Sequence, residues 1–243
     1  MPRTELGERV YAIGDVHGCH DLLRALLDRI GDHYAALEPA AALHIVFLGD
    51  IIDRGPDSFK VMELLYDLHT RTNRVLVLRG NHEEVMLQVL AGDVEMLAPW
   101  MKFGGASTVR SFGLAPFRSG DNVAQYLAQL RAAVPPEWVT WLKRLPLTAR
   151  SGDYFFCHAG VRPGVPLRRQ TRNDLLWIRD DFLDDDRSHG AVIIHGHSIE
   201  AQVEVRPNRI GIDTGAYRTG ELTALYLEGD AYEVLSVTRA ELG

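Results

Sequence analysis

The sequence LHIVFLGDIIDRG, residues 43–55, places an apolar run directly before a cluster of charged side chains. Short apolar runs that are rich in β-branched or aromatic residues and bounded by glycine are typical of buried strands. Four other stretches have the same form: VYAIGDVHG at 10–18, VLVLRGNHE at 75–83, YFFCHAG at 154–160 and AVIIHGHS at 191–198. The pattern predicts five buried strands, each followed at once by Asp, Asn or His.

The residues that follow these predicted strands form a candidate set of metal ligands. In open α/β sheets, ligands bind beyond the carboxyl ends of the strands, so we expect one edge of a sheet to collect the set. The oxygen and nitrogen donors, with no thiolate, suit Mn²⁺, Fe, Zn²⁺ or Co²⁺ rather than Ca²⁺. A single Asp at a strand end is often only a helix cap, so the inference depends on the whole set. Its members are Asp15, His17, Asp50, Asn81, His158 and His197.

The composition is typical of a soluble globular protein, with 243 residues, 46% hydrophobic and 24% charged. This length fits one domain over residues 1–243. The net charge of −7 argues against nucleic acid as a partner. It does not exclude a phosphorylated substrate, because bound divalent cations dominate the local field at such a site.

The N-terminal residues contain no cationic and apolar signal region, and no apolar run approaches the roughly 18 residues that span a bilayer. We therefore expect a cytoplasmic protein with no membrane partner. Only two cysteines are present, Cys19 and Cys157, so the sequence predicts no disulfide framework. Both are expected to be buried core residues.

The chain divides into three regions. The first half alternates predicted strands and helices as a βαβαβ unit, which implies a parallel sheet. Residues 92–150 are rich in helix signals and aromatic side chains, and they are expected to form an inserted helical cap. The cap has two interpretations, a lid that shapes substrate access or a layer that packs on the sheet. Strands are expected in the C-terminal third at 203–206, 209–213, 222–227 and 232–238.

The motifs, in this order, resemble those of the calcineurin-like metallophosphoesterases, specifically the bacterial phosphoprotein phosphatase branch. They are GD-x-HG at 14–18, GD-x-x-DRG at 49–55, GNHE at 80–83, a His at 158 and Gly-His at 196–197. The resemblance covers most of the chain. It implies an α/β fold, an αββα sandwich of two packed sheets with outer helices and the cap insertion.

The resemblance also implies two divalent metals, with Mn²⁺ first among Fe, Zn²⁺, Co²⁺ and Ni²⁺. Hydrolysis would then proceed by direct attack of a hydroxide bound by both metals. Asp50 would bridge the metals. The first metal would also take Asp15 and His17, and the second would also take Asn81, His158 and His197.

Five further residues have roles that the resemblance implies. His82 would protonate the leaving oxygen and Asp53 would orient its ring, although a buried structural His–Asp pair is the alternative. Arg54, Arg179 and Arg79 are candidates for binding phosphate, because the planar guanidinium binds two oxygens at once. For Arg79 the alternative is an ordinary surface role. His195 could contact the site only indirectly.

Two departures from related families narrow the predicted function. Ile199 stands where many metallophosphodiesterases have a second His, and the 212–216 segment resembles bacterial branches. We therefore expect a phosphatase for phosphomonoesters, with phosphoserine or phosphothreonine in proteins as the main candidate substrate. One alternative is an enzyme that cleaves diadenosine tetraphosphate symmetrically or hydrolyses another small phosphoester. The other is a non-catalytic scaffold that binds metal. The oligomeric state stays open.

Overall fold

The computed structural model describes all residues from 1 to 243, and its centre is a pair of five-stranded sheets. The first sheet has the strand order β10–β9–β1–β2–β3 and the second has the order β4–β5–β6–β8–β7. In the first sheet β1, β2 and β3 are parallel, β9 is antiparallel to β1, and β10 is antiparallel to β9. In the second, β5, β6 and β8 are parallel, and β4 and β7 pair antiparallel at the edges.

The strands have the following bounds: β1 Glu8–Ile13, β2 Ala42–Phe47, β3 Val75–Val77, β4 Thr148–Ser151, β5 Tyr154–Cys157, β6 Val192–His195, β7 Glu204–Val205, β8 Arg209–Gly211, β9 Glu221–Glu228 and β10 Ala231–Thr238. The helices are α1 His20–Ala35, α2 Ser58–Arg71, α3 Asn81–Ala91, α4 Leu97–Trp100, α5 Ala106–Ser111, α6 Val123–Ala133, α7 Pro136–Arg144, α8 Arg172–Trp177, α9 Asp180–Leu183 and α10 Ala216–Thr219. A π-helical turn, Met101–Gly105, joins α4 to α5.

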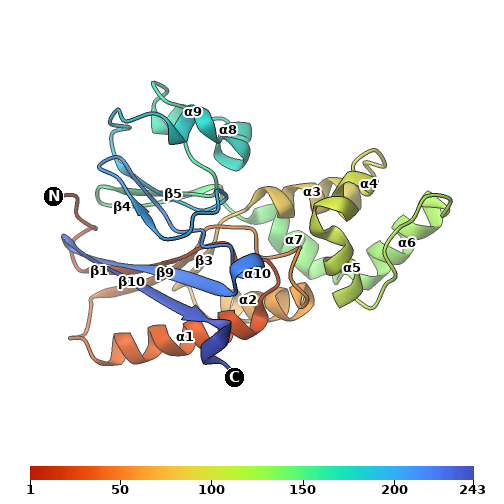
Figure 1. Cartoon of the computed structure of the whole chain (residues 1–243), viewed down its shortest axis with the longest axis horizontal. Helices are drawn as coiled ribbons and strands as arrows, with labels where there is room; N and C mark the ends of the chain where they lie inside the picture. The colour runs from red at the N-terminus through yellow and green to blue at the C-terminus, as the bar shows by residue number, and fades with distance from the viewer.

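Three apolar cores separate four layers. Figure 1 shows α8 and α9 above the second sheet and α1 below the first. The core between the sheets includes Val10 and Val46 from the first sheet and Phe156 and Ile194 from the second. A larger core lies between the first sheet and helices α1 to α7, and a smaller one between the second sheet and α8 and α9. The αββα sandwich with outer helices is confirmed.

The parallel βαβαβ unit at the N-terminus forms because helix and strand patterns alternate as predicted. Helix α1 buries Leu22, Leu23, Leu26 and Ile30, which are spaced on one helical face against the first sheet. The four strands expected in the C-terminal third are present and pair as two hairpins, β7–β8 and β9–β10. The hairpins belong to different sheets, because β9 and β10 return to the first sheet whereas β7 and β8 complete the second.

One expectation about the sheets is wrong. The five motif strands do not end at the edge of a single sheet, because β1, β2 and β3 belong to the first sheet and β5 and β6 to the second. The ligand candidates therefore meet where two packed sheets end together. Local strand patterns cannot reveal this division, since it depends on which strands pair over long distances in the sequence.

Residues 92–147 contain α4, the π-helical turn, α5, α6 and α7, and residues 148–150 belong instead to β4. Trp100, Trp138 and Trp141 are buried in the same core as α2 and α3. The helices α4 to α7, residues 97–144, are called the α4–α7 segment below, and they extend to the right of the sheets in Figure 1. No helix combines the length and apolar character that crossing a bilayer requires. Cys19 and Cys157 are both buried and unbonded.

Candidate active site

The loops that follow the motif strands have unusual backbone geometry. Only five non-glycine residues have a positive φ angle, and all five belong to the motifs: His17 at 44°, Asp50 at 48°, Asp53 at 71°, Arg54 at 68° and His197 at 65°. A left-handed backbone at a residue other than glycine costs on the order of 1–3 kcal/mol and is concentrated at functional sites. The rest of the fold must therefore offset this cost, and the strained backbone sets the direction of these five side chains.

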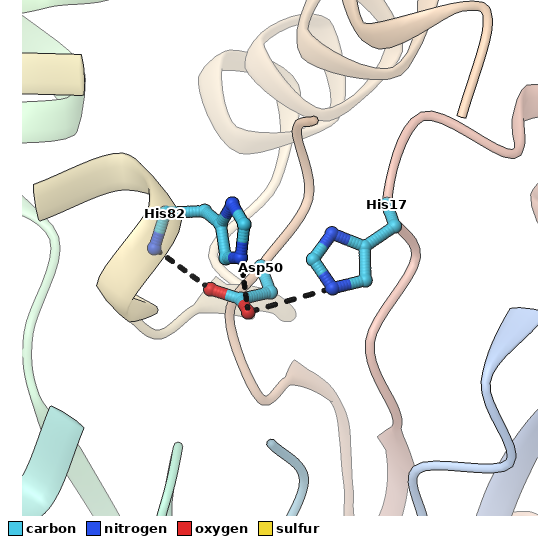
Figure 2. A group of neighbouring side chains, drawn as sticks. All are labelled: His17, Asp50 and His82. Atoms are coloured by element: carbon cyan, nitrogen blue, oxygen red, sulfur yellow. Dashed lines mark hydrogen bonds and ion pairs between the residues drawn. The ribbon is translucent and has the colours of Figure 1, made fainter. Parts of the chain in front are cut away.

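Asp50 lies at the centre of the site. Figure 2 shows the rings of His17 and His82 next to each other beside its carboxylate, and their centroids lie 4.8 Å apart. The Nε2 atoms of His17 and His158 each lie 3.5 Å from Asp50 Oδ2, and the backbone N–H of His82 donates to Oδ1 at 3.0 Å.

The hydrogen bonds of His17 and His158 use Nδ1 and leave Nε2 of each ring available to bind a metal. Nδ1 of His17 lies 2.8 Å from the carbonyl oxygen of Ile52, and Nδ1 of His158 lies 3.0 Å from that of Leu48. A carbonyl only accepts, so each Nδ1 carries a proton. Burial lowers the pKa of both imidazoles, that of His17 to about 3, so the rings are neutral and each Nε2 presents a lone pair. A backbone carbonyl that accepts from the nitrogen not bound to the metal, here Nδ1, is typical of metal-binding histidines.

Around Asn81, acceptor atoms face acceptor atoms. Its Oδ1 lies 2.8 Å from His158 Nε2 and 3.0 Å from His197 Nδ1. His158 Nε2 carries a lone pair, so nothing in this pair of atoms can donate a proton. Facing lone pairs in a buried place suit a cation that both atoms bind, and the donor set of the site fits one.

Asp15 provides a second sign that the site suits cations. Its Oδ1 is buried without a hydrogen-bond partner, whereas Oδ2 accepts from the backbone N–H of His197 at 3.1 Å. Burial raises the pKa of Asp15 well above its usual range, and the nearby carboxylates of Asp213 and Asp50 add to this. A bound divalent ion would relieve both the repulsion and the missing partner.

Two glycines of the motifs are required by this packing. A Cβ atom at Gly80 would lie 2.1 Å from Asp50 Oδ1, and one at Gly196 would lie 2.1 Å from Asp15 Oδ1. Any side chain at these positions would displace a candidate metal ligand.

The donors form two overlapping groups. The ligating atoms of His17, Asp50 and His82 lie within 4.8 Å of one another, and those of Asp50, His158 and His197 do as well. Asp50 is common to both groups, which is the arrangement that a bridging carboxylate needs. Asp15 and Asn81, both buried, border these groups through the contacts described above.

His82 is held by a buried carboxylate. Its Nδ1 lies 2.7 Å from Asp53 Oδ2, while Nε2 lies 3.8 Å from Asp50 Oδ2. Burial acts to lower the pKa of His82, but Asp50 and the hydrogen bond with Asp53 more than offset it and leave the pKa raised. The arrangement favours a protonated imidazole whose Nε2 is directed into the site.

A cleft with a volume of about 240 Å³ opens beside these groups. Two aromatic side chains on its wall are exposed, Phe103 by 64% and Trp177 by 43%. Such exposure of large apolar rings beside a polar centre makes the cleft a candidate binding surface. The lining residues are Arg54, Asn81, His82, Val85, Trp100, Phe103, Trp177, Arg179 and His197.

The three candidate arginines have different places. Arg54 and Arg179 line the cleft, and Arg54 Nη1 donates to the Tyr217 hydroxyl at 3.0 Å. Arg79 does not line it, which differs from the expectation. Its guanidinium is buried and donates to the Leu142 carbonyl at 2.8 Å and to Glu84 at 3.1 Å, so it ties the start of α3 to α7.

His195 lies outside the site. Its Nδ1 is 3.1 Å from the carbonyl oxygen of Gly196, and its ring packs at 5.1 Å against Phe182 of α9. Sequence reasoning missed several residues that border the site, although Trp177 stands in the LLWIRDD stretch beside Arg179 and could have been inferred from it. The others, which no local spacing distinguishes, are Trp100, Phe103, Thr108, Asp213 and Tyr217.

Comparison with known families places the whole arrangement. Residues 8–225 match the calcineurin-like phosphoesterase family. This match spans most of the chain, and the protein therefore belongs to that family. The expected family and the metallophosphoesterase class of hydrolase are confirmed.

Relatives with assigned names are similar over long stretches. The asymmetrical bis(5'-nucleosyl)-tetraphosphatase PrpE of Bacillus cereus strain B4264 is 24% identical over 229 residues, which cover 88% of each chain. The symmetrical bis(5'-nucleosyl)-tetraphosphatase of Dechloromonas aromatica strain RCB is 31% identical over 153 residues, 63% of this chain and 44% of that protein. A crystal structure of a putative diadenosine tetraphosphatase aligns with a TM-score of 0.65 at 21% identity, covering 98% of this chain and 99% of that one. At that identity the structural likeness concerns the fold alone.

Proposed function

We propose that this protein is a metal-dependent hydrolase that cleaves dinucleoside tetraphosphates. The observation that carries the proposal is the cleft, which places exposed Phe103 and Trp177 beside Arg54 and Arg179 and next to the candidate metal groups. Arginine forks suit phosphate oxygens, and flat exposed rings suit nucleobases. The names of the relatives above support the same substrate class.

The proposed metal ligands follow from the buried donors. Asp15, His17 and Asp50 would hold one ion, and Asp50, Asn81, His158 and His197 the other. Two metals held there would activate a water molecule and neutralise charge on the phosphoryl oxygens. Mn²⁺ is the first candidate, and the oxygen and nitrogen donors also suit Fe, Zn²⁺, Co²⁺ and Ni²⁺.

The site residues that are not proposed metal ligands would bind the substrate, donate a proton to it or shield it from water. Arg54 and Arg179 would bind phosphate oxygens and orient the phosphorus. Nε2 of His82 would donate a proton to the leaving oxygen, while Asp53 holds Nδ1 of the same ring at 2.7 Å. Trp100 and Val85 would exclude water from the inner wall of the cleft, which they line.

A second candidate is the dephosphorylation of phosphoserine or phosphothreonine in proteins. One observation favours it: Ile199 replaces the second His that many metallophosphodiesterases carry, as in the phosphoprotein phosphatases that the motifs resemble. Arg54 and Arg179 suffice for a single phosphoryl group, so the inner part of the site serves either substrate.

The purified protein with Mn²⁺ should be offered diadenosine tetraphosphate, a panel of phosphopeptides and 4-nitrophenyl phosphate, and the kcat/KM values compared. We expect the dinucleotide to give the highest value, with ADP alone as product for symmetrical cleavage or AMP and ATP for asymmetrical cleavage. A phosphopeptide preference would favour the second candidate. No hydrolysis of any of them would refute the proposed enzyme.

A further inference from the structure

We propose that Trp100 and Thr108 are positioning residues that fix the orientation of His82 through the carboxylate of Asp53. Both belong to the α4–α7 segment rather than to the motif loops. The inference rests on the proposed role of His82 as the proton donor, and it assigns to this segment a part in the reaction in addition to its part in packing.

The Asp53 carboxylate is fully buried, and each of its oxygens has a partner in the α4–α7 segment. Oδ2 accepts from the indole N–H of Trp100 at 2.9 Å and from His82 Nδ1 at 2.7 Å. Oδ1 accepts from the Thr108 hydroxyl at 2.5 Å. With both oxygens held, the carboxylate cannot rotate about its terminal bond, so the direction of the His82 ring is also set.

Thr108 fixes the backbone of Asp53 as well as its side chain. The Asp53 N–H donates to Thr108 Oγ1 at 2.9 Å and to Ser58 Oγ at 3.0 Å. A hydroxyl has one hydrogen and two lone pairs, so Thr108 can donate to the carboxylate and accept from this N–H at the same time. Asp53 and Arg54 both have positive φ angles, 71° and 68°, and this strained loop needs such support.

Trp100 connects the cleft to the same carboxylate. Its ring is fully buried yet lines the cleft, and its N–H donates to Asp53, which does not line the cleft. The ring packs directly on Gly105, so closely that a Cβ at this position would lie 2.5 Å from the Cδ2 and Cε2 atoms of Trp100. Nearby, the Arg54 N–H donates to the Gly104 carbonyl at 3.2 Å. The segment thus holds the proton donor and a phosphate-binding residue together.

Trp141 shows that a buried tryptophan of this segment does not need a hydrogen bond. Its ring is 4% exposed and its Nε1 has no partner. Trp141→Phe therefore removes the same N–H from the same core without touching Asp53, and it is the matched control for Trp100→Phe.

The experiment measures kcat and KM for a series of aryl phosphates, from phenyl to 4-nitrophenyl, with Mn²⁺ present. The variants are Trp100→Phe, Thr108→Val, Thr108→Ser and Trp141→Phe. We expect Trp100→Phe and Thr108→Val to lower kcat for phenyl phosphate roughly tenfold, which is less than the 10²–10⁴-fold that general acid catalysis provides. The kcat for 4-nitrophenyl phosphate should stay within about twofold, because its leaving group needs little proton donation. KM should be unchanged in all variants. Thr108→Ser keeps the hydroxyl and should therefore keep the wild-type kcat. Trp141→Phe should also have the wild-type kcat for both substrates.

A double variant adds an independent test. Because Trp100 acts through Asp53, Trp100→Phe should slow the Asp53→Asn enzyme hardly further. Equal slowing of phenyl and 4-nitrophenyl phosphate, with metal content and melting temperature preserved, would overturn the inference and leave the proposed hydrolase in place. If Trp100→Phe does not fold, the nearly isosteric Thr108→Val decides alone. A wild-type protein that hydrolyses no aryl phosphate, no phosphopeptide and no diadenosine tetraphosphate would overturn the proposed function and the inference together.

Discussion

Asp50 is held from several directions at the centre of the site. Three imidazoles lie within 3.8 Å of its Oδ2, the His82 backbone N–H donates to its Oδ1, and its own N–H donates to Glu83 at 2.9 Å. It also has a positive φ angle of 48°. A residue held from so many directions is suited to join two metals with fixed geometry, and a substitution there should affect both.

Asp50→Asn is expected to be the most damaging change of a single proposed ligand. Loss of the charge weakens both ions at once, so metal content should fall and kcat/KM should drop by more than the roughly 10–100-fold that disturbing a ligand's partner costs. Metal analysis of the purified variant beside activity checks this. Retention of two ions with a near-normal rate would show that Asp50 is not the bridge.

His82→Ala should slow substrates according to their leaving groups. The serine oxygen of a phosphoserine peptide leaves as a basic alkoxide, so hydrolysis of such peptides should slow about 10²–10⁴-fold. Hydrolysis of 4-nitrophenyl phosphate should slow much less, because its leaving group needs little proton donation. Asp53→Asn should have the same pattern more weakly, because it disturbs only the orientation of the ring. Metal content must be compared in both variants, since Asn81 is adjacent. Equal slowing with metals in place would remove His82 from the role of proton donor.

At the scale of elements, the first turn of α3 organises the loops around it. Asn81 and His82 face the site, whereas the next residue, Glu83, points to the β2 loop. The Glu83 carboxylate accepts from the N–H groups of Asp50 and Ile51 at 2.9 Å each and of Gly80 at 2.8 Å. Glu84 pairs instead with Arg172 of α8 at 2.7 Å and with Arg79. One helix turn thus connects both sheets' loops.

Glu83→Gln should destabilise the fold more than Glu84→Gln. The amide at 83 would place a donor against backbone donors in a fully buried place, and an unsatisfied buried group costs about 1–3 kcal/mol. The partly exposed ion pairs of Glu84 are worth about 1 kcal/mol or less. Urea unfolding of the two variants and the wild type measures the difference. A larger loss at Glu84 would mean that the ion pairs across α3 and α8 matter more than the backbone contacts.

At the scale of the whole molecule, the site lies where two separate sheets end together, with the α4–α7 segment on one side and α8 on the other (Figure 1). Buried carboxylates from both sheets' loops meet there. Asp15 follows β1 of the first sheet and Asp213 follows β8 of the second, and burial raises the pKa of Asp213 to about 6. Cations bound between the sheets would therefore hold them together.

Removal of metal should abolish activity and lower the melting temperature. Bound ligand stabilises the native state by about 2.7 kcal/mol at 100 times its Kd, so Mn²⁺ should raise the melting temperature of the stripped protein in a concentration-dependent way. Calorimetry and rate measurements after chelation and readdition check both effects. Full activity of protein with metal content near zero would contradict the proposal.

Hydrolysis should occur without a phosphoenzyme, because the chain presents no nucleophilic side chain in the cleft apart from the proposed ligands and His82. Direct attack by water predicts inversion at a chiral phosphorus, and ¹⁸O from labelled water should enter the released phosphate within one turnover. Retention of configuration would indicate a covalent intermediate and a different reaction path.

The sequence by itself determined the strands, the donor atoms that follow them and the family. Hydrophobic runs and glycines are local signals, and each of the six ligand candidates stands within a few residues of its strand, so local pattern sufficed. The tertiary structure decided what lies around them. Trp100 and Thr108 reach Asp53 across 47 and 55 residues of sequence, and Tyr217 reaches Arg54 across 163. Arg79 left the expected site for the Leu142 carbonyl, 63 residues away. Such partners follow from how the sheets and helices pack, which no spacing within a motif encodes.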